Sequence, residues 1–151
     1  MSVKYFINPK LKLVLYVCVG ALTGQDFLSA VTEAARELGQ SKERIDSIID
    51  ALDAYDELDL EDMKQATHVI NNEIKDWDYP TKVAVYTMSK GVILLAEAIT
   101  IISIGNLNLH GFSNIRELIN WLELSGMEEE LISFWIEARS SLQLASDTLN
   151  T

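Results

Sequence analysis

The chain has 151 residues, which is close to the commonest size of a single folded domain. Its hydrophobic content of 48%, with only 2 Pro and 7 Gly, excludes a disordered protein and indicates one that buries a core. Its one cysteine, Cys18, excludes an internal disulfide and any metal site built from several cysteines of this chain. A lone thiol also fits a reducing, cytoplasmic location.

The net charge of −11 is unevenly distributed. The segment from Ser41 to Pro80 holds 12 acidic and 4 basic residues, and therefore carries −8 of this charge. Such a field repels phosphate backbones and anionic membranes, so we expect no nucleic-acid partner. The apolar stretch Val92–Ile104 is too short to span a bilayer, and we expect no stable membrane insertion.

The first elements are predicted to form a β-hairpin. Val3–Ile7 and Lys10–Val19 have the composition of strands, and Asn8-Pro9 lies between them. Residues 13–22 are apolar and follow several lysines, as in a secretory signal. However, the period-two alternation of their side chains and their β-branched residues favour a strand. The sequence Thr23-Gly-Gln-Asp26 then resembles a capping box, and it predicts a helix that Gly39 ends.

In the middle of the chain, the sequence predicts two strands, with an acidic segment and a helix between them. Ile45–Leu52 is a third strand, and Asp53–Asp59 is an acidic loop after it. Apolar residues from Leu60 to Trp77 recur at three- and four-residue steps, which is typical of an amphipathic helix. Pro80 stops that helix, and Thr81–Thr87 is a fourth strand.

The last third of the chain is predicted to be mainly helical. Ser89–Ser103 is a strongly apolar helix, Leu107–Phe112 a short fifth strand, and Ser113–Leu124 a further helix. A second capping box, Ser125-Gly-Met-Glu128, opens a helix that can run to about Leu149.

This order of elements predicts an α/β fold with a mixed, mostly parallel five-stranded sheet. An N-terminal β-hairpin begins the sheet, helices cover it, and an extra C-terminal helix follows. We expect an α/β domain over residues 1–124. Residues 125–151 would form a helical extension that packs on the domain or on a partner.

Three segments resemble the STAS superfamily, especially its branch similar to stage II sporulation protein AA. They are Val19-Gly-Ala-Leu-Thr-Gly-Gln-Asp-Phe27, Thr81-Lys-Val-Ala-Val-Tyr86 and Gly111-Phe-Ser-Asn-Ile-Arg-Glu-Leu-Ile-Asn-Trp-Leu122. The resemblance covers roughly residues 4–122. It implies a non-enzymatic protein, because members of the family are generally not enzymes, and some of them are regulators that bind anti-sigma factors. Related Sec14-like domains hold an apolar ligand.

The sequence departs from this family at one functional position. The regulatory members carry a phosphorylated serine at the start of the helix after the third strand. Here that region, Asp50–Leu60, contains no serine or threonine, and a phosphate would meet several carboxylates. The resemblance therefore does not extend to phosphorylation.

No catalytic or metal-binding motif stands out. His68 and His110 have no partner at metal-ligand spacing, and Cys18 lies in a predicted buried strand where a small core residue is expected. The acidic surface around Asp56, Glu57 and Asp59 lacks the spacing and the glycine of a calcium loop, so a solvated loop is expected, with docking of a basic partner as the alternative. Ser89-Lys90-Gly91 is a weak candidate for binding a small anion.

The first functional hypothesis is a regulatory protein–protein interaction domain that self-associates, for example as a dimer. Its predicted contact residues lie on the apolar helix and on the C-terminal helix: Ile99, Ile102, Trp135 and Leu142. The alternative is a carrier of a small apolar or lipid-like ligand in a pocket beside helix 92–104. An enzyme ranks third, because no acid–base or nucleophile–base pair emerges, and no cofactor is expected.

Overall fold

The computed structural model describes residues 3–21, 24–38, 45–55, 61, 64–65, 68, 81–93 and 107–149. Five strands form one sheet in the order β1-β2-β3-β4-β5. Their bounds are β1 Val3–Asn8, β2 Leu13–Ala21, β3 Asp46–Tyr55, β4 Thr81–Tyr86 and β5 Leu107–Phe112. β1 pairs antiparallel with β2, and the other pairs are parallel. The predicted mixed, mostly parallel sheet with an N-terminal hairpin is therefore confirmed.

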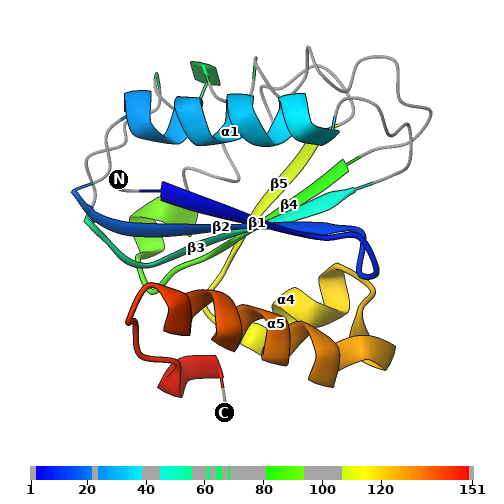
Figure 1. Cartoon of the computed structure of the whole chain (residues 1–151). Coiled ribbons are helices and arrows are strands. Elements are labelled where there is room, and N and C mark those ends of the chain that lie inside the picture. Colours follow the sequence, from blue (N-terminus) through cyan, green and yellow to red (C-terminus); the bar gives the residue numbers. More distant parts are fainter. Residues whose placement is uncertain are drawn as a thin grey trace.

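Helices cover the sheet on both faces (Figure 1). One face lies under α1, Gly24–Leu38, and the other under α4, Ile115–Trp121, and α5, Glu128–Ser141. The alternation along β2 explains why both faces are covered. Val14, Tyr16 and Cys18 belong to the apolar cluster that contains α1 residues, while Leu13, Leu15 and Val17 belong to the one that contains α4 and α5 residues. All six residues of this stretch are buried, so this part of β2 is covered on both faces.

The hairpin turn is built from side-chain and backbone hydrogen bonds. Asn8 accepts a hydrogen bond at Oδ1 from the Leu11 amide, 3.0 Å away, and the Lys12 amide donates to the Pro9 carbonyl over 3.3 Å. Lys12 adopts a positive φ of 53°, which turns the chain into β2. The turn therefore lets β1 pair antiparallel with β2.

Several predicted bounds of the helices and strands are wrong. β3 continues to Tyr55, so the start of the expected acidic loop is part of the strand. α5 ends at Ser141 instead of near Leu149, because Gln143 takes a positive φ of 59° and the chain reverses into a short 3-10 helix, Asp147–Leu149. α4 is shorter than expected at both ends: Asn114 caps its start by accepting at Oδ1 from two amide groups, and Glu123 takes a positive φ of 61° after its last turn.

The second capping box is also absent. The Ser125 hydroxyl donates to Oδ1 of Asn120 over 2.6 Å, and no side chain caps α5 at Met127. Thr23 of the first box lies outside the described residues. In the predicted helix after Leu60, the described residues Glu61, Lys64, Gln65 and His68 are helical and exposed.

Candidate functional site

A groove of about 450 Å³ lies between the edge strand β1 and the helix α1. The described residues that line it come from these two elements: Val3, Lys4, Tyr5, Asp26, Ser29, Ala30 and Glu33. Among the strands that the structure describes, β1 has β2 as its one partner, so the other edge of β1 borders this groove. We call this feature the β1–α1 groove.

Helical spacing explains which side of α1 lines the groove. Asp26, Ala30, Glu33 and Glu37 follow one another at steps of four, three and four residues, and therefore lie on one stripe of the helix. Ala30 is buried at the base of this stripe and, as a small residue, leaves space above the sheet. Glu33 and Glu37 are exposed. We call Asp26, Glu33 and Glu37 the acidic stripe.

A hydrogen bond joins β1 to the acidic stripe. The Tyr5 hydroxyl donates to Oε2 of Glu37 over 2.6 Å. This hydrogen bond to a carboxylate, together with partial burial and the charge of Glu33, raises the pKa of Tyr5 to about 12. The phenol therefore stays protonated at neutral pH and acts as a donor that holds α1 against β1.

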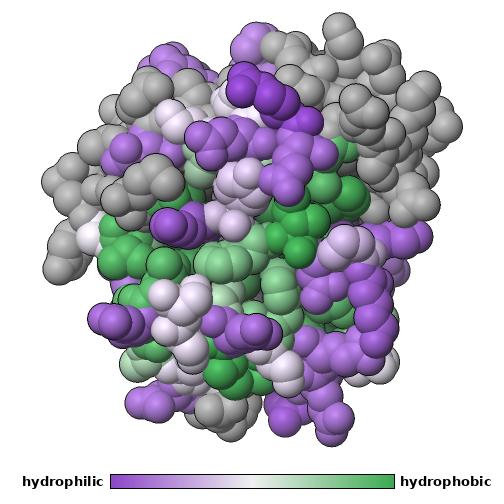
Figure 2. Space-filling view, viewed as in Figure 1, coloured by the Kyte–Doolittle hydropathy of each residue, from purple (hydrophilic) through white to green (hydrophobic). Residues whose placement is uncertain are grey.

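The edge strand leaves apolar surface partly uncovered. Tyr5 and Ile7 pack against the cluster under α1, and Phe6 packs against the cluster on the other face. Each of these three side chains is only half-buried. Figure 2, viewed as in Figure 1, shows apolar side chains gathered in a band across the middle of this side of the molecule, between α1 and the layer of α4 and α5.

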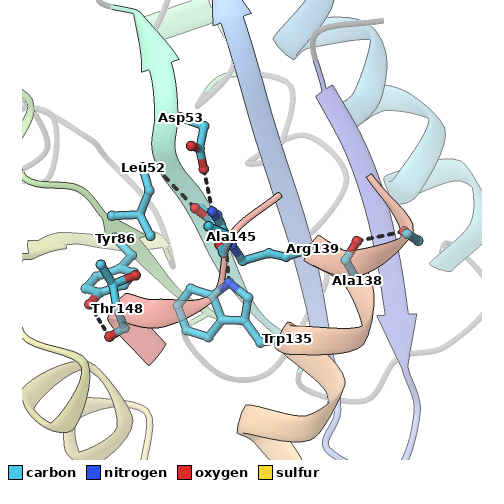
Figure 3. Close-up of polar contacts among 10 residues, drawn as sticks. Leu52, Asp53, Tyr86, Trp135, Ala138, Arg139, Ala145 and Thr148 are labelled. Carbon is cyan, nitrogen blue, oxygen red and sulfur yellow. Dashed lines mark hydrogen bonds and ion pairs between the residues drawn. The ribbon is translucent and has the colours of Figure 1, made fainter. Parts of the chain in front are cut away.

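The second polar feature is a buried charge network on the opposite face of the sheet (Figure 3). Oδ2 of Asp50 accepts from Nε1 of Trp135 and from Nη1 of Arg139, each at 2.7 Å. Nη2 of Arg139 donates to Oδ2 of Asp53 at 2.5 Å. The side chain of Asp50 is fully buried and that of Arg139 nearly so, whereas Asp53 is 37% exposed.

A β-bulge brings both aspartates to the same arginine. Val17 pairs with Asp50 and Val19 with Asp53, so β3 holds one more residue than β2 between these pairs. Regular alternation would place residues 50 and 53 on opposite faces of the sheet, and the extra residue returns Asp53 to the face of Asp50. The amide of Leu52, within the bulge, donates to Oδ1 of Asp50 at 3.2 Å.

Burial and neighbouring charges shift the pKa values of ionisable side chains around this network. Burial alone would lower the pKa of Arg139, but the hydrogen bonds and charges of Asp50 and Asp53 outweigh burial and raise it. Burial, followed by the charge of Asp50, raises the pKa of Tyr86 and also that of the Cys18 thiol. Cys18 is therefore an unreactive core residue, as the sequence predicted.

The same network holds the C-terminal segment. Nε of Arg139 donates to the Ala145 carbonyl at 2.7 Å, and the Tyr86 hydroxyl donates to the Thr148 carbonyl at 3.4 Å. The rings of Tyr86 and Trp135 meet edge to face, with centroids 5.3 Å apart. These contacts join β3, β4, α5 and the last described residues into one packed unit, so the network is structural.

The predicted contact residues differ in their burial and in whether the structure describes them. Trp135 is completely buried in the core of its own chain, and its indole N–H donates to Asp50. Leu142 is half-buried and packs against the same core. Ile99 and Ile102, and with them the wall of the predicted apolar pocket, lie outside the described residues. Asp56, Glu57 and Asp59 also lie outside them.

The histidines lie apart from both features. His68 is exposed on a helical segment, and His110 packs beside Phe112 and Trp121 at centroid distances of 4.7 and 5.7 Å. Within the described ranges, no group of three or more His, Cys, Asp or Glu residues could hold a metal ion. The same ranges contain no helix that is both long enough and apolar enough to cross a membrane.

Sequence reasoning missed both the β1–α1 groove and the charge network. The groove residues of β1 and those of α1 lie about twenty or more positions apart in the sequence. Their local sequence pattern does not predict that they come together. The network had one signal: Asp50 is a charged residue inside a predicted buried strand, and such a residue needs a partner. The identity of that partner, 89 residues away, is not readable from periodicity.

The sheet order, its N-terminal hairpin and the two helical layers define an α/β protein with a SpoIIAA-like fold, as the STAS resemblance implied. Neither a family model nor a curated protein sequence matches the chain. Among solved structures, it is similar to an uncharacterized protein of the DUF3478 family with a SpoIIAA-like fold from Shewanella loihica PV-4. The TM-score is 0.53 at 16% identity, over 80% of this chain and 91% of that one, and such a likeness establishes the fold alone.

Proposed function

We propose that this protein is a non-enzymatic interaction module that binds an extended segment of a protein partner along β1. The observation that carries the proposal is the β1–α1 groove, which borders the outer edge of an edge strand. An edge strand presents backbone N–H and C=O groups to one side, and these can pair with an added strand.

The groove suits the side chains of such a segment. In an added strand, alternate residues point to the same face, and those on the α1 side would enter the groove. Its volume of about 450 Å³ lies within the range of ordinary ligand sites. An added strand would also cover the half-buried side chains of Tyr5, Phe6 and Ile7, and this apolar contact favours binding.

Two further considerations support a binding role. The resemblance to the STAS superfamily implies action through partners. The charge network holds the layer of α4 and α5 on the sheet, and the β1–α1 groove lies on the opposite layer.

The test is a selection of linear peptides from a displayed random library. Ser29 is exposed on α1 and lines the groove, so the variant Ser29→Trp fills the groove without touching the core. The matched control is Ser133→Trp, at an exposed position of α5 on the other layer. We expect selected peptides to bind the wild type and Ser133→Trp equally, and to bind Ser29→Trp at least about tenfold more weakly.

Hydrogen exchange locates the bound segment. A bound peptide should protect backbone amides of β1, because they become paired in the sheet. The proposal fails if no linear peptide is enriched, if Ser29→Trp binds as well as the wild type, or if protection appears only away from β1.

A further inference from the structure

We infer that the segment bound along β1 is basic, with lysine or arginine at alternate positions and apolar residues between them. This inference rests on the proposed function and specifies its partner. It follows from the charges of the groove, from the spacing of the acidic stripe and from the net charge of the chain.

The charges of the groove are mainly negative. Asp26 and Glu33 line it, Glu37 lies one turn further along α1, and Lys4 is the one cation among the described lining residues. Glu33 and Glu37 are exposed, so their charges are available to a molecule in the groove. Glu37 also accepts the hydrogen bond from Tyr5 at the edge strand, which places a carboxylate directly above β1.

The spacing of the acidic stripe matches an extended chain. Along a helix, residues four apart are separated by about 6 Å and residues seven apart by about 10 Å. In a strand, successive side chains on one face are about 7 Å apart. Two successive same-face cations of an added strand can therefore lie opposite Glu33 and Glu37.

A second copy of this chain is a less favourable occupant. Each copy carries a net charge of −11, and pairing along β1 would bring two acidic stripes to the same side of the molecule. A basic segment instead lowers the repulsion among the carboxylates. Each exposed ion pair strengthens binding by up to about fivefold, so the two pairs with Glu33 and Glu37 suffice for a marked preference.

The experiment uses three labelled synthetic peptides on the full chain: an alternating Lys–Val peptide and its Gln–Val and Glu–Val counterparts. Fluorescence anisotropy measures their affinity at low and at high salt. We expect the Lys–Val peptide to bind at least about tenfold more tightly than the Glu–Val peptide at low salt. High salt should reduce this preference, because the screening length falls from about 10 Å at 0.1 M to about 3 Å at 1 M.

Paired variants separate the acidic stripe from the overall charge. The double variant Glu33→Gln/Glu37→Gln should weaken Lys–Val binding at least about threefold. The double variant Glu129→Gln/Glu137→Gln changes the net charge equally, at exposed positions of α5, and should leave the affinity unchanged. Equal losses in both double variants would show attraction to net charge alone and would overturn the inference.

The outcomes distinguish the inference from the proposed function. Equal binding of the Lys–Val and Gln–Val peptides, lost in Ser29→Trp, would overturn the basic partner and leave the β1 site in place. A dimer in native mass spectrometry that Ser29→Trp lacks would identify a second copy as the occupant and overturn the inference. Binding that does not respond to Ser29→Trp would overturn the proposed function itself.

Discussion

Asp50 and Arg139 show how a charge pair can be placed inside a small core. Removing a carboxylate from water is costly, and it is tolerated when the oxygens are fully hydrogen-bonded. Here Oδ1 of Asp50 accepts from the Leu52 amide, and Oδ2 accepts from Trp135 and Arg139. Because each donor comes from a defined position on β3 or α5, the pair also sets how α5 lies on the sheet.

Replacement of Arg139 by an uncharged residue should therefore destabilise the folded state strongly. We expect Arg139→Met to lower the free energy of unfolding by about 3–5 kcal/mol, because Asp50 would remain as a buried charge with no cationic partner. Asp53→Asn should lower it by less than about 1 kcal/mol, since Asp53 is partly exposed to solvent. Urea denaturation monitored by tryptophan fluorescence measures both changes.

The double variant Asp50→Leu/Arg139→Met is the control for this explanation. It removes both charges, so it should be more stable than Arg139→Met alone, even though the indole N–H of Trp135 loses its acceptor. A loss below about 1 kcal/mol in Arg139→Met would contradict the assignment of this pair as a structural element.

Tyr5 provides a pH-dependent contact at the groove. Its folded-state pKa, about 12, lies above the unfolded value of 10.0, so the contribution to stability is complete below pH 10 and is lost as the pH rises toward 12. In Glu37→Gln we expect the pKa of Tyr5 to fall toward 10.0, because the hydrogen bond to a carboxylate and its charge are the main causes of the shift.

Titration of carbon-13-labelled tyrosine rings by NMR follows this change, with Tyr5→Phe identifying the signal. The alkaline loss of stability between these pH values should be smaller in Glu37→Gln than in the wild type. An unchanged Tyr5 titration in Glu37→Gln would contradict the contact.

At the scale of elements, β4 and β5 were well predicted, whereas the ends of β2, β3, α4 and α5 were not. Thr81–Tyr86 and Leu107–Phe112 appear within one residue of their predicted bounds, because period-two alternation and flanking breakers are local signals. The end of α5 depends instead on Arg139, whose Nε holds the Ala145 carbonyl after the chain has turned back. A regular helical stripe up to Leu149 contains no sign of that turn.

Gly111 lies where the segment after β4 packs closely against β5, so its substitution tests this packing. A Cβ atom at this position would lie 2.7 Å from Cα of Ile93, which is backbone and cannot move aside easily. We expect Gly111→Ala to lower the free energy of unfolding by about 1–3 kcal/mol through overpacking. Thermal and urea denaturation measure the loss.

Gly126 is the matched control, because a Cβ atom there would meet nothing within 4 Å. Gly126→Ala should change the stability by no more than about 0.5 kcal/mol. Equal stabilities of the two alanine variants would show that Ile93 does not approach β5 this closely.

At the scale of the whole molecule, the two helical layers differ in character. The layer of α4 and α5 is tied to the sheet by buried charges, aromatic contacts and the C-terminal segment. The α1 layer meets the edge strand at an acidic groove. This asymmetry is the basis for placing the partner on the α1 side.

The large negative charge should also affect stability as a whole. With 23 acidic and 12 basic residues, the folded chain repels itself, and added salt screens this repulsion. We expect the melting temperature to rise by roughly 2–4 °C between about 0.02 M and about 0.5 M sodium chloride. Calorimetry measures it, and Glu129→Gln/Glu137→Gln should show a shallower rise. A melting temperature that falls with salt would indicate that attractive ion pairs dominate.

The sequence by itself determined the elements of the sheet, the N-terminal hairpin and the acidic character of the chain. These follow from periodicity and composition, which depend on neighbouring residues only. Tertiary structure alone decided that Trp135 is buried, that a bulge aims Asp50 and Asp53 at Arg139, and that β1 and α1 enclose a groove. Such features depend on how segments far apart in the chain are placed against one another, and side-chain periodicity carries no information about that placement.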